Sequence, residues 1–489
     1  MNLFFASLGL STASAAQVEI FPGDDLVART ASLQPGDELI LADGLYQVRD
    51  ALEWSVLATE AAPVTIRAAE GATPIIEITP DKKGEYPSYI VKIDKSEWIS
   101  IEGITIRGSV DWDRGEADFG GVRIRDSAHI TITNSEIAQT PGTLLYLSNT
   151  NADITVENTR LRDTVDGYGV YVGCSDASCW TSSSRLSNNW IHGIGGDGTY
   201  AVWLSHGSQG ISLTDNVIYG AEYRGVFLGS TEFGDQNIFE GNALWNVSNI
   251  GLLVYGSARI RNNIIFNIDG TGIYVDNPGR ETFNDVVISF NTIANTTGWG
   301  TQLLNWYDAS GMVFANNAVC NPVGYSVYYP APSDIDDTAT PPTDNVLSSN
   351  VLCGLVDSFD RIDVPEAVIP GAGESDFEDV EGWNFYPSSS ESTLVNAADP
   401  SGDTFIPDID FNGIARDGAA PEAGAYEWAG AGNPGWFIQE GFKELAEAPK
   451  LIEEQVGGGC CGDKGSAEAV LLVPLLGLGA LRRRRRRTA

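Results

Sequence analysis

The sequence has few basic residues. Its 489 residues include 29 Lys and Arg against 66 Asp and Glu, which gives a formal net charge of −37, and only three His. Six of the arginines gather at Arg482–Arg487, so the rest of the chain is more acidic still. Such a surface repels a phosphate backbone, which disfavours a nucleic-acid partner. It suits a soluble extracellular protein, and it could hold Ca²⁺; no other cofactor is indicated.

Motifs that would mark a metal site, a cysteine nucleophile or a helical fold are also missing. None of the six cysteines has CxxC spacing, and no Cys-centred nucleophile signature is present. Long amphipathic helical patterns are absent, which argues against an α/β barrel. Cys174 and Cys179 flank a four-residue loop, and Cys320 and Cys353 follow strand-like runs. These four predict two disulfides in an oxidising compartment, with the pairing open.

Residues 1–16 are predicted to be a signal peptide. They are apolar and then small, and Ala13-Ser14-Ala15 fits an A-x-A cleavage site. No Lys or Arg precedes the apolar part, which a start codon placed too late would explain. A buried first strand is the alternative.

The C-terminal residues 457–489 combine three features in a fixed order. Glycines with Cys460 and Cys461 lead into the apolar stretch Ala469–Leu481, and Arg482–Arg487 follow. The apolar stretch is shorter than the ~20 residues of a membrane-spanning helix. This order resembles the C-terminal sorting signals of myxobacterial surface proteins. The resemblance implies recognition and cleavage near the cysteines and a place at the cell surface; a plain tail anchor is the alternative.

A repeat runs along the middle of the chain. Asparagines followed by an apolar residue two or three places later recur at steps of 21 to 33 residues. A turn of about 21–26 residues with occasional insertions is what a parallel β-coil needs, because each coil packs only on its neighbours. Stacked asparagines at ~4.8 Å spacing could hydrogen-bond in a ladder. The asparagines are Asn134, Asn158, Asn189, Asn216, Asn242, Asn263, Asn291, Asn317 and Asn350.

Three early segments resemble the opening of pectate-lyase-like right-handed β-helix proteins. They are QPGDELILADGLY at 34–46, VTIRAAEG at 64–71 and ISIEGITI at 99–106. DFNGIARD at 410–417 and GAYE at 424–427 resemble the terminal segment of surface-anchored β-helix proteins. We therefore expect an all-β, single-stranded right-handed parallel β-helix of about ten to twelve coils over residues 17–430. Residues 431–456 are expected to be a tether, with a short helix in Trp436–Glu454.

One outward strand position is predicted to form an aromatic stripe. Phe227 and Tyr274 each lie eleven residues after a repeat asparagine, and apolar residues that should point inward flank both of them. An exposed stripe along the coil axis suits the apolar faces of a polysaccharide, although a covering segment would make it ordinary packing. With Arg280, the predicted substrate-binding residues are Tyr146, Tyr171, Trp203, Phe227 and Tyr274.

Candidate catalytic residues are few. A polysaccharide lyase must neutralise a carboxylate, for which Arg224 or Arg280 could serve, and needs a base such as His206 or Tyr223. His192 is a further candidate, and a structural or surface role is the alternative for His206. The Lys/Arg pair of alginate and chondroitin lyases has no counterpart, since no Lys occurs between residues 96 and 442. The epimerase Tyr-Gly-Phe-Asp-Pro-His pattern and the polygalacturonase Asp-Asp patterns are also missing.

Three functions remain open on these grounds. The first is a cell-surface or secreted polysaccharide-active enzyme, acting as a lyase on uronic-acid glycans. The second is a non-catalytic glycan-binding or adhesive surface protein, and the third is a structural spacer. We expect a monomer whose partner is a polysaccharide and whose contact with a membrane is made only through the C-terminal segment.

Overall fold

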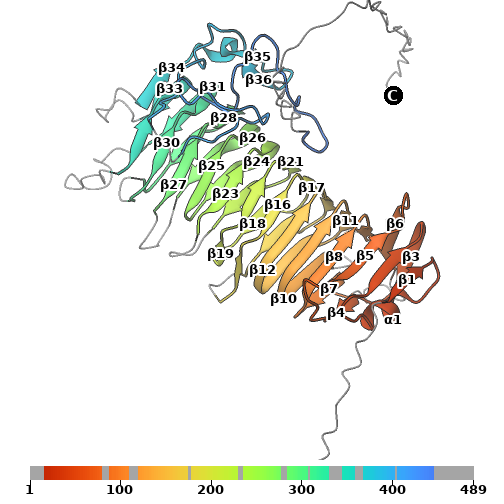
Figure 1. Ribbon diagram of the computed structural model, residues 1–489. Helices are drawn as coiled ribbons and strands as arrows, with labels where there is room; N and C mark the ends of the chain where they lie inside the picture. The colour runs from red at the N-terminus through yellow and green to blue at the C-terminus, as the bar shows by residue number, and fades with distance from the viewer. Residues whose placement is uncertain are drawn as a thin grey trace, which may run out of the picture. The chain divides into compact units, whose positions relative to one another are not determined.

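The structure is a computed structural model (Figure 1), in which the described residues all belong to one compact unit. The predicted signal peptide up to residue 15, Arg280, Cys460 and Cys461 lie outside the described residues, as does the whole of 457–489. The described residues are 16–79, 87–108, 119–174, 178–229, 235–276, 284–306, 309–329, 344–357, 367–401 and 405–444.

The chain winds into a right-handed parallel β-helix, so the predicted fold class is confirmed (Figure 1). Each coil contributes a strand to each of three faces, here called sheets I, II and III, and the strands of successive coils pair in parallel. Sheet I contains the strands that precede the repeat asparagine, sheet II those that follow it, and sheet III those after the next bend.

Sheet I contains β1 (Gln17–Ile20), β2 (Glu38–Leu41), β5 (Val64–Ala68), β8 (Glu97–Glu102), the second halves of β10 (Gly120–Thr133) and β12 (Leu145–Glu157), β16 (Arg185–Ser187), β20 (Ser212–Thr214), β23 (Asn237–Glu240), β25 (Ala258–Arg261), β27 (Val286–Ser289), β30 (Val313–Ala315) and β32 (Val346–Ser348).

Sheet II contains β3 (Gly44–Val48), β6 (Pro74–Ile78), β9 (Thr105–Arg107), β11 (Glu136–Thr140), β13 (Arg160–Thr164), β17 (Trp190–Ile194), β21 (Val217–Ala221), the first parts of β24 (Ala243–Val254), β26 (Ile264–Val275), β31 (Ala318–Tyr328) and β33 (Asn350–Asp357), together with β28 (Thr292–Thr296) and β34 (Val368–Pro370).

Sheet III contains β4 (Leu52–Trp54), β7 (Tyr89–Asp94), β14 (Val170–Val172), β18 (Tyr200–Leu204), β22 (Arg224–Leu228), β29 (Thr301–Leu303) and the remaining parts of β10, β12, β24, β26, β31 and β33. The short strands β15 (Trp180–Ser182) and β19 (Ser208–Gln209) pair at the corner between sheets III and I.

The predicted asparagine ladder exists, with a correction of register at its start. Seven asparagines from Asn189 to Asn350 are buried. Each of the first six amides donates to the amide oxygen of the asparagine one coil further on, for example Asn242 Nδ2 to Asn263 Oδ1 at 3.0 Å, and the last, Asn350, donates to backbone carbonyls. The residue before each ladder position has a left-handed φ. Asn134 and Asn158 occupy this left-handed position and not the ladder, where Ser135 and Thr159 stand.

Segments outside the coil pack near its N-terminal end and on one of its faces. Near the N-terminus, α1 (Leu26–Ala31) is capped by Asp25, whose side chain accepts from Ala28 N at 2.9 Å. Near the C-terminus, η4 (Gly373–Asp376), β35 (Phe377–Asp379), β36 (Asn384–Pro387) and the chain up to residue 444 pack on the outer face of sheet II. No helix among the described residues has the length and hydropathy that a bilayer crossing requires.

The beginning of the predicted tether packs on the coil. Trp436 and Ile438 are buried, and Lys443 donates to Asp215 Oδ1 at 2.7 Å and to the carbonyl of Gly241 at 2.8 Å. The described part of the predicted helix, residues 436–444, is not helical. A segment held in this way is continuous with the folded body up to residue 444.

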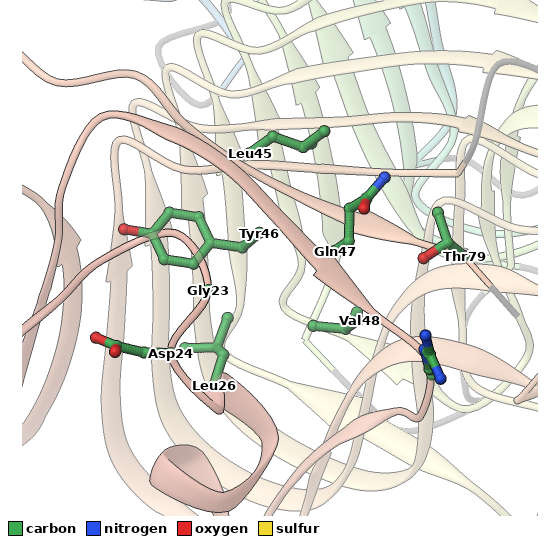
Figure 2. A pocket seen from close by; sticks show the side chains of 9 residues that line it. Gly23, Asp24, Leu26, Leu45, Tyr46, Gln47, Val48 and Thr79 are labelled. Atoms are coloured by element: carbon green, nitrogen blue, oxygen red, sulfur yellow. The ribbon is translucent and has the colours of Figure 1, made fainter. Parts of the chain in front are cut away.

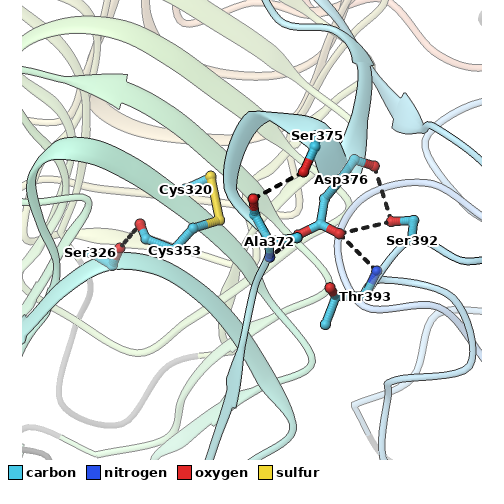
Figure 3. Close-up of a disulfide and its surroundings, with 8 residues drawn as sticks. All are labelled: Cys320, Ser326, Cys353, Ala372, Ser375, Asp376, Ser392 and Thr393. Carbon is cyan, nitrogen blue, oxygen red and sulfur yellow. Dashed lines mark hydrogen bonds between the residues drawn. A yellow bond between two sulfur atoms is a disulfide. The ribbon is translucent and has the colours of Figure 1, made fainter.

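The four predicted cysteines form two disulfides, Cys174–Cys179 and Cys320–Cys353. The second joins two adjacent coils at register partners on sheet II, beside the turn built around Asp376 (Figure 3). The carboxylate of Asp376 accepts from the backbone N–H groups of Ala372 and Thr393, each at 2.7 Å. The disulfide and this turn together fix the last coils.

Candidate functional site

The predicted aromatic stripe is a single column on the outer face of sheet III. Tyr146, Tyr171, Trp203 and Phe227 are successive register partners on β12, β14, β18 and β22. Their ring centroids lie 5.0, 6.0 and 4.5 Å apart in that order. The column continues through Leu253 to the partly exposed Tyr274 and the buried Gln302.

Phe227 does not present the exposed face that the sequence predicted. It is 2% exposed, because Trp203 and the rings of Tyr200 and Tyr255 pack around it. The accessible part of the column is therefore in two pieces. The half-buried rings of Tyr146, Tyr171 and Trp203 lie on one side of Phe227, and Tyr274 lies on the other side.

A second aromatic row was missed by the sequence reading. Tyr168 and Tyr200 stack at 6.3 Å with their rings 10° apart, and each lies three residues before a member of the column. Tyr200 meets Trp203 edge-on at 4.6 Å. The repeated spacing of two aromatics three residues apart, Tyr168–Tyr171 and then Tyr200–Trp203, is the sequence signal that could have revealed this row.

The guanidinium of Arg224 packs against two tyrosine rings, those of Tyr223 and Tyr200. Its guanidinium lies 4.6 Å from the ring centroid of Tyr223 and 5.4 Å from that of Tyr200, and it donates to the Tyr200 hydroxyl. No carboxylate of the described residues forms an ion pair with Arg224, whereas Arg162 binds Glu136 at 2.7 Å. Arg224 is thus a cation held by aromatic and phenolic groups, with no carboxylate partner in the part of the chain that the structure describes.

The tyrosines of the column are protonated at neutral pH. Burial raises the pKa of Tyr171 to about 12. Burial and the neighbouring charge of Asp276 raise the pKa of Tyr274 to about 12. Tyr274 donates to Asp276 Oδ2 at 3.2 Å, and Asn305 donates to Asp276 Oδ1 at 2.6 Å. These phenols can donate hydrogen bonds to a ligand, but they are poor proton acceptors.

The predicted catalytic residues do not form one cluster. His206 lies in the turn after β18, with its ring edge-on to Phe227 at 5.7 Å. Tyr223 and Arg224 lie at the opposite end of the sheet III strands, where β22 begins and Arg224 pairs with Tyr200. His192 lies on sheet II instead, because its strand β17 follows the ladder asparagine directly.

The surroundings of His192 explain why it is not part of the column. Its Nε2 accepts from Arg160 Nε at 3.1 Å, and its ring stacks on Tyr219 at 5.0 Å. Burial and the charge of Arg160 lower the pKa of His192 to about 4. At neutral pH this neutral imidazole is a packing partner and hydrogen-bond acceptor on sheet II.

A separate depression near the N-terminus contains none of the predicted site residues (Figure 2). It has a volume of about 390 Å³, and Leu45, Tyr46, Gln47 and Val48 of β3 line one side of it. Tyr46 donates to the carbonyls of Ile20 and Ala42, at 2.7 and 2.9 Å. The Tyr46 hydroxyl therefore stabilises the first coil by binding two of its backbone carbonyls.

Comparison with known proteins supports the fold. Residues 101–329, fewer than half of the chain, match the sequence model of a family described as periplasmic copper-binding protein (NosD). A crystal structure of pectate lyase Pel9A is 15% identical with a TM-score of 0.51, and the alignment covers 85% of this chain and 97% of that one. No curated protein sequence is detectably similar.

Two further solved structures overlap less. The periplasmic alginate epimerase AlgG is 12% identical over 70% of this chain and 84% of that one, with a TM-score of 0.45. An alginate lyase from Paenibacillus sp. str. FPU-7 is 15% identical over 70% and 99%, with a TM-score of 0.42. The comparison of folds therefore rests on the pectate lyase, and at such identity a shared fold does not imply shared chemistry.

The described residues do not fit a copper site. The three histidines stand apart: His129 stacks on Trp98 at 4.1 Å at the start of the sheet I part of β10, His192 lies on sheet II, and His206 lies at the corner after sheet III. Met312 is buried in the apolar core, and the four described cysteines are in disulfides. No group of three His, Cys, Asp or Glu side chains that could hold a metal exists among the described residues.

Proposed function

We propose that this chain is an exported glycan-binding β-helix protein that holds an anionic polysaccharide along sheet III. The aromatic column supplies flat apolar surfaces at successive coils, which suits the C–H faces of pyranose rings. Coils stack about 4.8 Å apart, close to the rise of one sugar ring, so a chain along the axis can meet several coils in turn.

The observation that carries the proposal is the set of groups that contact the Arg224 guanidinium, which are aromatic and phenolic. A chain with a net charge of −37 repels anions in general, so an arginine that no described carboxylate pairs with needs another partner or stays solvated. Arg224 is held in place by Tyr200 and Tyr223 beside the column. A uronate carboxylate could accept its remaining N–H groups in the paired geometry that guanidinium and carboxylate favour.

Elimination is the second candidate function, favoured by the contact of Tyr223 with Arg224. In a lyase the base removes the C5 proton, a C4=C5 double bond forms, and the C4–O bond breaks with the leaving sugar oxygen taking a proton. Arg224 would neutralise the carboxylate, and Tyr223 or His206 would move the proton. Binding is placed first because the predicted catalytic residues do not form one cluster, and because the column tyrosines Tyr171 and Tyr274, with pKa values of about 12, supply no base of their own.

Export is supported by two features of the chain and its comparison. Two disulfides are characteristic of proteins that fold in an oxidising compartment. The matching family is described as periplasmic. The surface attachment expected from residues 457–489 is part of the proposal and can be tested by labelling intact cells.

The proposed function is tested by affinity gel electrophoresis of the full chain in polygalacturonate, alginate and a neutral glucan. We expect retardation in one of the uronate polymers. Trp203→Ala and Arg224→Gln should each weaken it about tenfold, the effect of losing a stacking ring or a charged hydrogen bond. Arg185→Gln is the matched control, since Arg185 lies on sheet I with an exposed partner in Glu157. Equal mobility of wild type in all three gels would refute the proposal.

The same samples separate binding from elimination. A rise in ultraviolet absorbance from the unsaturated uronide, lost in Arg224→Gln and Tyr223→Phe, would establish a lyase. Retardation without any such rise would leave binding as the function.

A further inference from the structure

A second depression lies at the corner between sheets III and I. It has a volume of about 520 Å³, within the range of roughly 300–1,000 Å³ of small-molecule sites. Its lining comes from three successive coils, at the starts of β23, β25 and β27. The lining residues are Asp235, Gln236, Ile238, Ser257, Arg259 and Asp285.

The polar groups of this depression are arranged around Arg259. Its Nη2 donates to Gln236 Oε1 at 3.2 Å, and Gln236 Nε2 donates to the backbone carbonyl of Asp285 at 2.7 Å. Arg259 forms no ion pair with a carboxylate in the described part of the chain, although Asp235 and Asp285 line the same depression. By contrast, Arg261, two residues further along β25, is paired with Glu240 at 2.9 Å.

The lining therefore offers both donors and acceptors. The guanidinium and the amide can donate to a hydroxyl, and the two carboxylates can accept from one, which is the combination that sugar hydroxyls need. Two carboxylates against one guanidinium leave the lining negative, which disfavours an anionic ligand. The depression thus differs from the surface around Arg224, where the guanidinium lies against tyrosine rings.

The depression lies near the column. Ser257 follows Leu253 by four residues, so the chain path between them spans at most about 14 Å. Resting on the glycan-binding function proposed above, we propose that this corner is a subsite for a neutral hexose residue of the same polysaccharide. The polysaccharide then carries both uronate and neutral sugars.

The subsite is tested on the full chain by saturation-transfer NMR with glucose, galactose, mannose and glucuronate. We expect one neutral hexose to receive saturation, and the signal to fall about tenfold in Arg259→Gln and in Asp285→Asn, the cost of one hydrogen bond to a charged group. Asparagine also tolerates the left-handed φ of residue 285. Arg261→Gln removes the same charge outside the depression and should leave the signal unchanged.

Failure of the subsite and failure of the proposed function are distinguishable. Trp203→Ala should leave the hexose signal intact while weakening uronate polymer binding. A hexose signal that disappears in Trp203→Ala and persists in Arg259→Gln would assign the sugar to the column and overturn the subsite. Absence of a signal for all three neutral hexoses would also overturn it, whatever the uronate gels show.

Discussion

Removal of one ladder asparagine should destabilise the coil more than any surface change of equal size. In Asn242→Ala, the lost amide takes four hydrogen bonds with it. Asn242 Nδ2 donates to Asn263 Oδ1 at 3.0 Å and to the Leu213 carbonyl at 2.9 Å. Its Oδ1 accepts from Asn216 N at 2.9 Å and from Asn216 Nδ2 at 3.0 Å. All four of these bonds are buried.

The expected loss follows from the groups left without partners. The Asn216 N–H, one Asn216 amide proton and the Leu213 carbonyl each lose a partner. A buried polar group left unsatisfied costs ~1–3 kcal/mol. We expect a total of about 4 kcal/mol, because such costs are not additive among neighbours.

The measurement is urea unfolding followed by tryptophan fluorescence. Repeats couple only to their neighbours, so the loss should appear as an earlier transition of the coils around β24. Asn246→Ala is the control: Asn246 is exposed and has a left-handed φ of 52°, so only a backbone cost of about 1 kcal/mol is expected. Equal losses in the two variants would show that the ladder bonds do not stabilise the fold.

Three further predictions concern the other faces. Lys443→Ala should cost about 2 kcal/mol of local stability, because it removes two hydrogen bonds made by a buried ammonium, to the partly exposed Asp215 and to the Gly241 carbonyl, and it should speed thermolysin cleavage within 405–444; Arg185→Ala, which breaks a more exposed pair, should not. His192 has a folded pKa of about 4 against 6.5, so the unfolded chain takes up its proton first and stability falls as the pH drops from 6.5 to 4. The NMR titration midpoint of His192 should lie near 4, a midpoint near 6.5 would contradict the structure, and His192→Gln should flatten the stability curve in this window. Replacing Cys320 and Cys353 by Ser should cost about 4 kcal/mol, because their disulfide closes a loop of 33 residues; a melting temperature unchanged from the oxidised wild type would contradict this.

The repeat predicted the fold because it reflects a geometric necessity. Every coil needs a sharp bend after sheet I, which a residue with a left-handed φ makes, and the next buried position needs a partner in the adjoining coil. Asparagine can make the left-handed bend, and it can also fill the buried position that follows. The sequence alone therefore does not show which of these two adjacent positions a given asparagine occupies. Asn134 and Asn158 make the bend, whereas Asn189 and its successors form the ladder.

The sequence predicted which residues form the column of the candidate site, but it did not predict which of their side chains are exposed. Strand alternation places Tyr171 and Trp203 on one outer line, since each coil adds one strand to the face. The burial of a column residue depends on side chains that are not part of the column. The rings of Tyr200 and Tyr255, for example, pack against Phe227 and cover it. His192 was misplaced because distance along the sequence does not show that a bend separates it from His206.

Sheets II and III each have a row of aromatic side chains on their outer face. A comparison of the two rows explains why the one on sheet III is accessible to a ligand. On sheet II, Tyr219, Trp245 and Phe266 stack at 4.7 and 5.6 Å, much like the column on sheet III. The C-terminal segment covers that row, with Trp383 packed on both Trp245 and Phe266. No described segment covers Tyr146, Tyr171 and Trp203 in this way, and they remain partly exposed. Similar sequences thus serve as core on one face and as surface on the other, and the position of the C-terminal segment decides between them.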